Sequence, residues 1–286
     1  MLTLSMAIFG SIGVFRRYIP LSSAALACFR GAAGAAFLFA VAKIRKKRIS
    51  HGIGIRKILL LAFTGAVMGL NWILLFEAYH YTTVSTATLC YYMQPTIVVL
   101  LSPLLFRERI TLKKGICAAL SLAGMVLVSG IVTGGFPSAS ELKGILLGLG
   151  AAALYATVVI MNKKLAGIDA YEKTIIQLLS AGAALVPYVL AGGQVISGEW
   201  TPAVIAMLAV IGVVHTGVAY ALYFGSMDGL RAQTVAIFSY LDPIVALVLS
   251  AVVLGERMTV YGAVGAVLII GAAVAGETGR DCTVSE

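Results

Sequence analysis

Two stretches of the sequence follow one pattern, and they decide how the chain is organised. One is Tyr91-Tyr92-Met93-Gln94-Pro95, followed by Phe106-Arg107-Glu108-Arg109-Ile110-Thr111. The other is Ser239-Tyr240-Leu241-Asp242-Pro243, followed by Leu254-Gly255-Glu256-Arg257-Met258-Thr259. In both, the glutamate comes 13 positions after the proline. The same offset aligns Trp72 with Tyr220 and Phe76 with Phe224, so the pattern predicts an internal repeat.

The composition predicts an integral membrane protein. Of the 286 residues, 60% are apolar and 12% are charged, whereas a soluble domain has about 45–50% and 25%. The mean hydropathy of +1.00 and four widely spaced cysteines exclude a disordered chain and a disulfide framework. We interpret the net charge of +9 as basic loops that face anionic membrane lipid, and we expect no nucleic-acid partner.

Charges and turn residues divide the apolar sequence into ten expected transmembrane helices. They are predicted at residues 1–15, 21–42, 58–80, 84–104, 111–132, 144–161, 172–192, 202–225, 232–254 and 259–276. A β-barrel is excluded because these runs are continuously apolar and about twice the length of a barrel strand.

The basic residues of the loops predict the orientation. With a cytoplasmic N-terminus, the inside loops contain Lys43, Arg45, Lys46, Lys47, Arg48, Arg56, Lys57, Arg107, Arg109, Lys113, Lys114, Lys163, Lys164, Lys173, Arg231 and Arg280. The outside loops then contain only Arg16, Arg17, Lys143 and Arg257. We therefore expect both termini in the cytoplasm and the protein in a bacterial cytoplasmic membrane.

The repeat and the span count together predict two inverted halves. We expect a first five-helix repeat at 1–132, an extracytoplasmic linker at 133–143, a second repeat at 144–277 and a cytoplasmic tail at 278–286. An odd number of helices per half inverts the second half relative to the first. Inverted repeats with a binding site between them are typical of secondary transporters.

The sequence resembles the EamA-type branch of the drug/metabolite transporter superfamily. The resemblance rests on Phe9-Gly10-Ser11, on Arg30 and on the two proline-to-glutamate segments, and it covers essentially the whole chain. It implies a transporter of small organic metabolites, such as amino acids, that often works as an exporter. It also implies no cofactor and no metal.

Two charged residues inside the spans are the main site candidates. Asp242 is expected close to the membrane midplane, where a carboxylate costs at least about 2.5–3.5 kcal/mol. It either binds a cationic substrate group or carries a coupling proton, or it forms a structural pair with Arg30 or is a carboxyl kept protonated by burial. Arg30 either binds a substrate carboxylate, pairs with Asp242 or Glu77, or joins two helices.

The remaining candidates are polar or aromatic residues on faces of the predicted helices. Tyr91 and Gln94 share a helical face, and Ser239 and Asp242 repeat that spacing. Prolines in helices favour kinks, and we expect two kinks at matching positions, Pro95 and Pro243. The other candidates for substrate binding are Trp72, Asn71, Tyr220 and His215.

These residues bear on three classes of function. A secondary transporter fits the inverted repeats best. Direct ATP drive is not expected, because no GxxxxGK[ST] motif is present. An intramembrane enzyme acting on lipid or prenyl substrates, or a receptor that does not transport, are the alternatives. Glu108-Arg109 and Glu256-Arg257 are interpreted as helix-terminal ion pairs or gate latches on opposite membrane sides.

Overall fold

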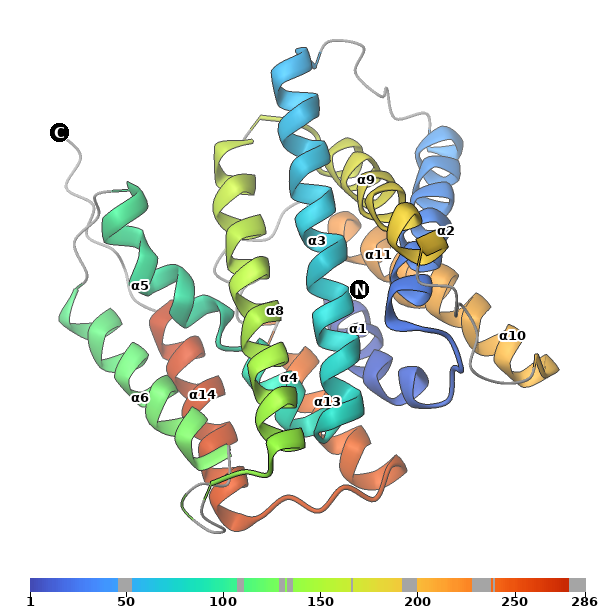
Figure 1. Cartoon of the computed structure of the whole chain (residues 1–286). Helices are drawn as coiled ribbons and strands as arrows, with labels where there is room; N and C mark the ends of the chain where they lie inside the picture. The colour runs from blue at the N-terminus through green and yellow to red at the C-terminus, as the bar shows by residue number, and fades with distance from the viewer. Residues whose placement is uncertain are drawn as a thin grey trace, which may run out of the picture.

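All elements of the described part of the chain are helices (Figure 1). The computed structural model describes residues 1–45, 53–106, 111–128, 132, 136–165, 167–191, 200–227, 238 and 240–277. The linker residues 133–135, the tail 278–286, Ser239, Lys46, Lys47, Arg48, Arg107, Glu108, Arg109, Arg231 and Arg280 lie outside these ranges.

The helices follow the ten predicted spans. The first half contains α1 (Leu2–Arg17), α2 (Ser23–Ile44), α3 (Ile55–Tyr81), α4 (Val84–Tyr91), α5 (Gln94–Phe106) and α6 (Leu112–Val128). The second half contains α8 (Ala139–Lys164), α9 (Ala170–Ala191), α10 (Pro202–Ala209), the π-helical segment η1 (Val210–Val218), α11 (Ala219–Met227), α13 (Leu241–Val253) and α14 (Val260–Glu277). The all-helical membrane fold is as the sequence predicts.

Six described segments are long and apolar enough to cross a membrane. They are Ser23–Ile44, Ile55–Tyr81, Val84–Leu101, Ala139–Asn162, Tyr171–Ala191 and Pro202–Tyr223. Leu241–Val253 and Val260–Gly276 are apolar but shorter. A span needs about 20 residues when it is one straight helix, so these two helices are each shorter than a full span.

Three local features differ from ten uninterrupted helices. The fourth span is broken into α4 and α5 by a turn at Tyr92 and Met93. The eighth span changes to π-helical geometry at Val210–Val218. The sixth begins at Ala139, inside the segment expected to be linker, because Ser138 and Glu141 form a capping box that starts the helix there.

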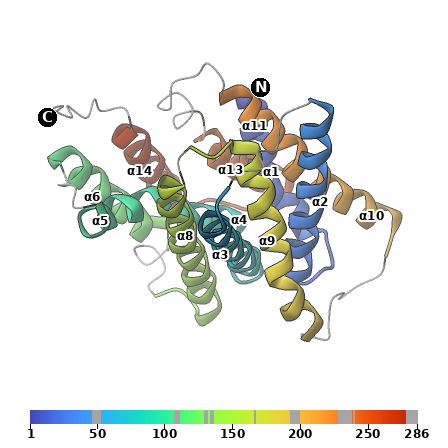
Figure 2. The ribbon, with the colours of Figure 1, turned by 90° about the horizontal axis from the view of Figure 1, so that it is seen from above.

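The packing of the two halves is pseudo-symmetric. α3 packs against α8. In the other half of the pattern, η1 and α11 correspond to α3 and α1 corresponds to α8, and these helices also pack against each other. α1 packs against α13, just as α8 packs against α4 and α5. Two pairs are formed by counterpart helices, α2 with α9 and α6 with α14; Figures 1 and 2 both show the α6–α14 pair at one edge of the molecule. Every major contact between halves thus has its counterpart, as two related repeats require.

Small residues allow the helices to approach closely. A Cβ atom added at Gly124 of α6 would lie 2.7 Å from the Gly265 carbonyl oxygen of α14, and one at Gly265 would lie 2.6 Å from that of Gly124. The backbones of the edge pair are therefore in direct contact, as is common between membrane helices.

Candidate functional site

Arg30 of α2 lies in the interior with an aromatic ring on one side. Its residue surface is 6% exposed, and its guanidinium carbon lies 4.3 Å from the centre of the Trp72 ring and 5.8 Å from that of Phe76. This is the geometry of a cation–π interaction. The side chain has one hydrogen bond within the described part of the chain, from Nε to Thr216 Oγ1 at 3.0 Å.

The π-helical turn positions the hydrogen-bond partner of Arg30. The Thr216 hydroxyl donates to the carbonyl of Ile211, five residues earlier, at 3.0 Å, and accepts from Arg30. A Cβ atom on Gly34, one turn beyond Arg30, would collide with the Thr216 side chain. Single π-helical turns occur frequently at functional sites, and this one brings the eighth span against α2 at Arg30.

Asp242 lies in the first turn of α13, beside Pro243. A carboxylate at a helix N-terminus is favoured by the helix dipole. Its side chain is half-buried, and it lies within electrostatic range of Arg30. The two do not form an ion pair, because the only ion pair with both partners described joins Arg17 and Glu256. The Tyr92 hydroxyl is close enough to Asp242 to interact with it.

Glycine allows α1 to approach α13 at Asp242. A Cβ atom on Gly10 would collide with the Asp242 carbonyl oxygen and lie 2.9 Å from Cβ of Val245. Gly10 belongs to the Phe9-Gly10-Ser11 stretch, whose Phe9 ring contacts Tyr220 at 5.2 Å between centroids and Tyr223 at 6.5 Å. The first span therefore reaches the helices of the second half directly at the site.

Tyrosines from both halves surround this pair of charges. Tyr91, the last residue of α4, stacks on Tyr155 of α8 with centroids 5.4 Å apart. Tyr91 and Tyr220 both lie within electrostatic range of Arg30. Arg30, Trp72, Tyr91, Tyr220 and Asp242 of the predicted set therefore come together, and they come from α2, α3, α4, α11 and α13.

Two predicted residues have partners outside this group. Asn71 is fully buried and donates from Nδ2 to the carbonyl of Ala151 on α8. His215 Nε2 lies 2.8 Å from Ser11 Oγ, and the His215 ring contacts Phe15 at 4.8 Å. Both residues therefore join neighbouring helices, which is a common role of isolated polar residues in membrane proteins.

The two predicted kinks are helix starts. Gln94 and Pro95 are the first two residues of α5, and Pro243 is the third residue of α13. Proline is favoured in the first helical turn, where its missing N–H would have no partner. Gln94 is half-buried, and no described contact links it to Arg30 or Asp242. Helix ends at membrane depth are tolerated where they line a cavity or are buried in protein.

Three residues of this group, Tyr92, Thr216 and Tyr155, were not among the predicted site residues. Tyr92 could have been found, because its counterpart Tyr240 is also a tyrosine at the same distance from the proline. Thr216 and Tyr155 carry no such signal. Their roles depend on contacts with α2 and α4, which are distant in the sequence.

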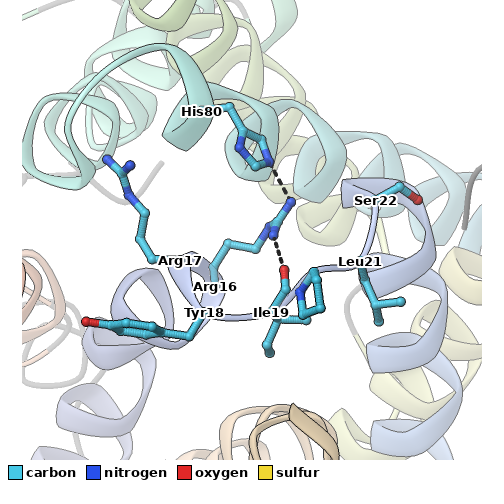
Figure 3. Close-up of a pocket in the computed structure, with 8 residues that line it drawn as sticks. Arg16, Arg17, Tyr18, Ile19, Leu21, Ser22 and His80 are labelled. Atoms are coloured by element: carbon cyan, nitrogen blue, oxygen red, sulfur yellow. Dashed lines mark hydrogen bonds between the residues drawn. The ribbon is translucent and has the colours of Figure 1, made fainter. Parts of the chain in front are cut away.

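A second polar cluster lies at the end of α1 (Figure 3). It surrounds a cavity of about 380 Å³ lined by Arg16, Arg17, Tyr18, Ile19, Pro20, Leu21, Ser22 and His80. The Arg16 guanidinium donates to the Ile19 carbonyl at 3.0 Å, to Ser23 Oγ at 3.1 Å and to His80 Nε2 at 2.7 Å. Arg16 is 2% exposed, so it is buried among partners from its own loop, α2 and α3.

The fold and the interior charges define a membrane transporter built from two repeats. The comparisons with known proteins agree: residues 1–130 and 142–275 each match the EamA-like transporter family. The chain therefore belongs to this family, within the drug/metabolite transporter superfamily, and it is a transporter rather than an enzyme.

Similar proteins support the assignment. An uncharacterized transporter, YxxF of Bacillus subtilis, is 30% identical over 276 residues, which cover 94% of this chain and 85% of that protein. The protein RarD of Escherichia coli is 24% identical over 204 residues, covering 71% of this chain and 66% of RarD. A protein of known crystal structure shares the fold: the two structures align with a TM-score of 0.65 at 18% sequence identity. The alignment covers 96% of this chain and 94% of the other chain.

Proposed function

We propose that this protein is a secondary active or facilitative exporter of small organic metabolites such as amino acids. The substrate binds between the two repeats, which expose the site alternately to either side of the membrane. The observation that carries the proposal is the group around Arg30: two opposite charges, not paired with each other, lie among aromatic rings contributed by both halves.

The charges favour a substrate with both an anionic and a cationic group. The forked guanidinium of Arg30 suits a carboxylate, which can accept two parallel hydrogen bonds. Asp242 offers a carboxylate to an ammonium group. Trp72, Tyr91 and Tyr220 supply the aromatic wall that small-molecule sites commonly have, so amino acids with apolar side chains fit this arrangement.

The helix breaks support alternating access. α5 and α13 begin at Gln94 and Leu241, within one position of each other in the repeat alignment. In secondary transporters, discontinuous helices with their ends at the binding site are a recurring element of the moving parts. α4 and α13 also pack against each other although they belong to different repeats, so a relative movement of the repeats changes the site.

The described basic residues support a cytoplasmic N-terminus. Lys43 and Arg45 lie at the end of α2, and Arg56 and Lys57 at the start of α3. The opposite end of α3 is followed by residues without lysine or arginine up to the end of α5. Basic loops favour the cytoplasmic side, so we assign this end to the cytoplasm of a bacterial cell.

Counterflow in proteoliposomes tests the proposal. Purified protein is reconstituted, preloaded with a pool of amino acids or of nucleosides, and assayed for exchange of the labelled compounds. We expect exchange with amino acids and not with nucleosides, because nucleosides lack a carboxylate for Arg30. Repeating the assay with and without a pH gradient distinguishes proton coupling from facilitated diffusion.

The matched variants are Arg30→Gln and Glu77→Gln. Both remove one charge from a helix of the first half, but Glu77 has no hydrogen bond within the described residues. We expect loss of exchange with Arg30→Gln and wild-type exchange with Glu77→Gln. Exchange that persists in Arg30→Gln at the wild-type rate, or exchange of nucleosides alone, would contradict the proposed site.

A further inference from the structure

Glu256 of the second repeat contacts the first two residues of helix α4, which belongs to the first repeat. Its Oε1 accepts a hydrogen bond from the Val84 backbone N–H at 2.9 Å, and its Oε2 accepts from the Ser85 N–H at 3.2 Å and the Ser85 hydroxyl at 3.3 Å. Arg17 of α1 donates to Oε1 at 3.3 Å. The Glu256 side chain is only 10% exposed, so this carboxylate is almost covered by its partners.

The turn after α13 directs Glu256 towards α4. Gly255 has φ of +66°, in the left-handed region that glycine adopts without strain. The Glu256 N–H then donates back to the Ser250 carbonyl at 3.1 Å. The backbone N–H of Glu256 is therefore fixed by α13 itself, and a movement of α13 moves Glu256.

The carboxylate adds to the N-terminal cap that Thr83 gives α4. The first N–H groups of a helix have no partner inside the helix. Thr83 accepts one of them, from Thr86, through its hydroxyl, and Glu256 accepts those of Val84 and Ser85. A negative charge at this end is also favoured by the helix dipole, so the contact is stronger than a single exposed ion pair.

α4 and α13 are closed against each other along their length. At one end Ser85 and Ser250 are joined by a hydrogen bond between their hydroxyls, next to the Glu256 contact. At the other end Tyr92, which follows α4, interacts with Asp242 at the start of α13. The contact of Glu256 therefore lies about one short helix away from the candidate site, at the end where α4 begins.

We propose that Glu256 is the latch of a gate formed by α4 and α13. The latch is closed in this structure, and it opens when the two repeats separate at the end of the bundle where α4 begins. Water then solvates the released N–H groups of Val84 and Ser85 and the Arg17 side chain. The role of the gate in transport rests on the proposed function, whereas its opening can be measured without any substrate.

Cysteine reactivity tests the latch directly. Thr88 lies one turn beyond Ser85 on α4 and is 5% exposed. A Thr88→Cys reporter is placed in a background in which Cys28, Cys90, Cys117 and Cys282 are replaced by alanine, and its rate of reaction with a water-soluble maleimide is measured in detergent. We expect Glu256→Gln to raise this rate by about tenfold, because neutralising the carboxylate weakens several charge-assisted hydrogen bonds.

Glu141→Gln is the matched control. Glu141 also caps a helix, but its hydrogen bonds are confined to Ser138 of the same segment. We expect the reporter rate to stay within twofold of its starting value. An equal rise in both variants, or no rise in Glu256→Gln, would refute the latch.

A cross-link distinguishes gate opening from general loosening. Ser85→Cys and Ser250→Cys are added to the reporter carrying Glu256→Gln and are oxidised to a disulfide before labelling. We expect the reporter rate to return to the low value while the disulfide is intact. A rate that stays high in the oxidised protein would show that α4 and α13 do not form the gate. If the latch behaves as expected but no solute exchanges, the proposed function fails and the latch stands.

Discussion

Arg16 and Arg30 are two buried arginines with opposite environments. Arg16 donates to Ile19, Ser23 and His80, whereas Arg30 has only Thr216 and the faces of two aromatic rings within the described residues. A buried charge needs partners. The terminal nitrogens of Arg16 have three such partners in the protein, although its Nε has none within the described residues. Arg16 therefore stabilises the fold, whereas Arg30 retains hydrogen-bonding capacity that a substrate can use.

The strongest test of this difference is Arg30→Gln. Removing a charged hydrogen-bonding partner costs a substrate about 1.5–3 kcal/mol, which corresponds to a decrease in exchange of about 10- to 100-fold. We expect the midpoint of thermal unfolding in detergent to remain unchanged. A large drop in that midpoint would place Arg30 with Arg16 as a structural residue.

Asp242→Asn should have the next largest effect, about tenfold on exchange, because it removes one charge-assisted contact to the substrate. The double variant with Arg30→Gln sharpens the interpretation. If both residues bind substrate, the double variant exchanges substrate no faster than Arg30→Gln alone. Recovery of exchange in the double variant would instead show that the two charges balance each other structurally.

Gly10→Ala should reduce exchange by a few-fold. The added Cβ collides with the Asp242 backbone, and overpacking of this kind costs about 1–3 kcal/mol. Gly271→Ala is the control, because a Cβ atom there has no neighbour within 4 Å. Equal activity of the two variants would show that the distance between α1 and α13 does not affect the site.

Arg16→Gln should have the smallest effect on exchange per folded molecule and a clear effect on stability. Loss of its hydrogen bonds leaves the buried partners unsatisfied, at a cost of about 1–3 kcal/mol. The measurements are the fraction of protein that stays monodisperse after heating and the exchange rate of that fraction. Loss of exchange without loss of stability would remove the distinction between the two arginines.

Much of the fold could be predicted because its signals are local. Each span is a run of apolar residues, and the repeat is visible in the proline and glutamate spacing of two segments. The break between α4 and α5 was less predictable. Pro95 indicated a disturbance, but whether a proline kinks a helix or begins a new one depends on what neighbouring helices offer to the freed backbone groups.

The candidate site was predictable only in part. Charged and aromatic residues inside apolar spans stand out in a sequence, so Arg30, Trp72 and Asp242 were found. Tyr155 and Thr216 are ordinary helix residues until packing places them beside Tyr91 and Arg30. Asn71 and His215 stand out as polar residues, yet their partners belong to α8 and α1.

The sequence by itself determined the class of this protein, because hydrophobic length and repeat spacing are properties of the chain alone. The tertiary structure decided which buried arginine has several hydrogen-bond partners and which has one within the described residues. It also decided that Glu256 caps a helix of the other repeat, with about 170 residues between the partners. Such contacts depend on how helices from different halves pack, and neither half contains that information separately.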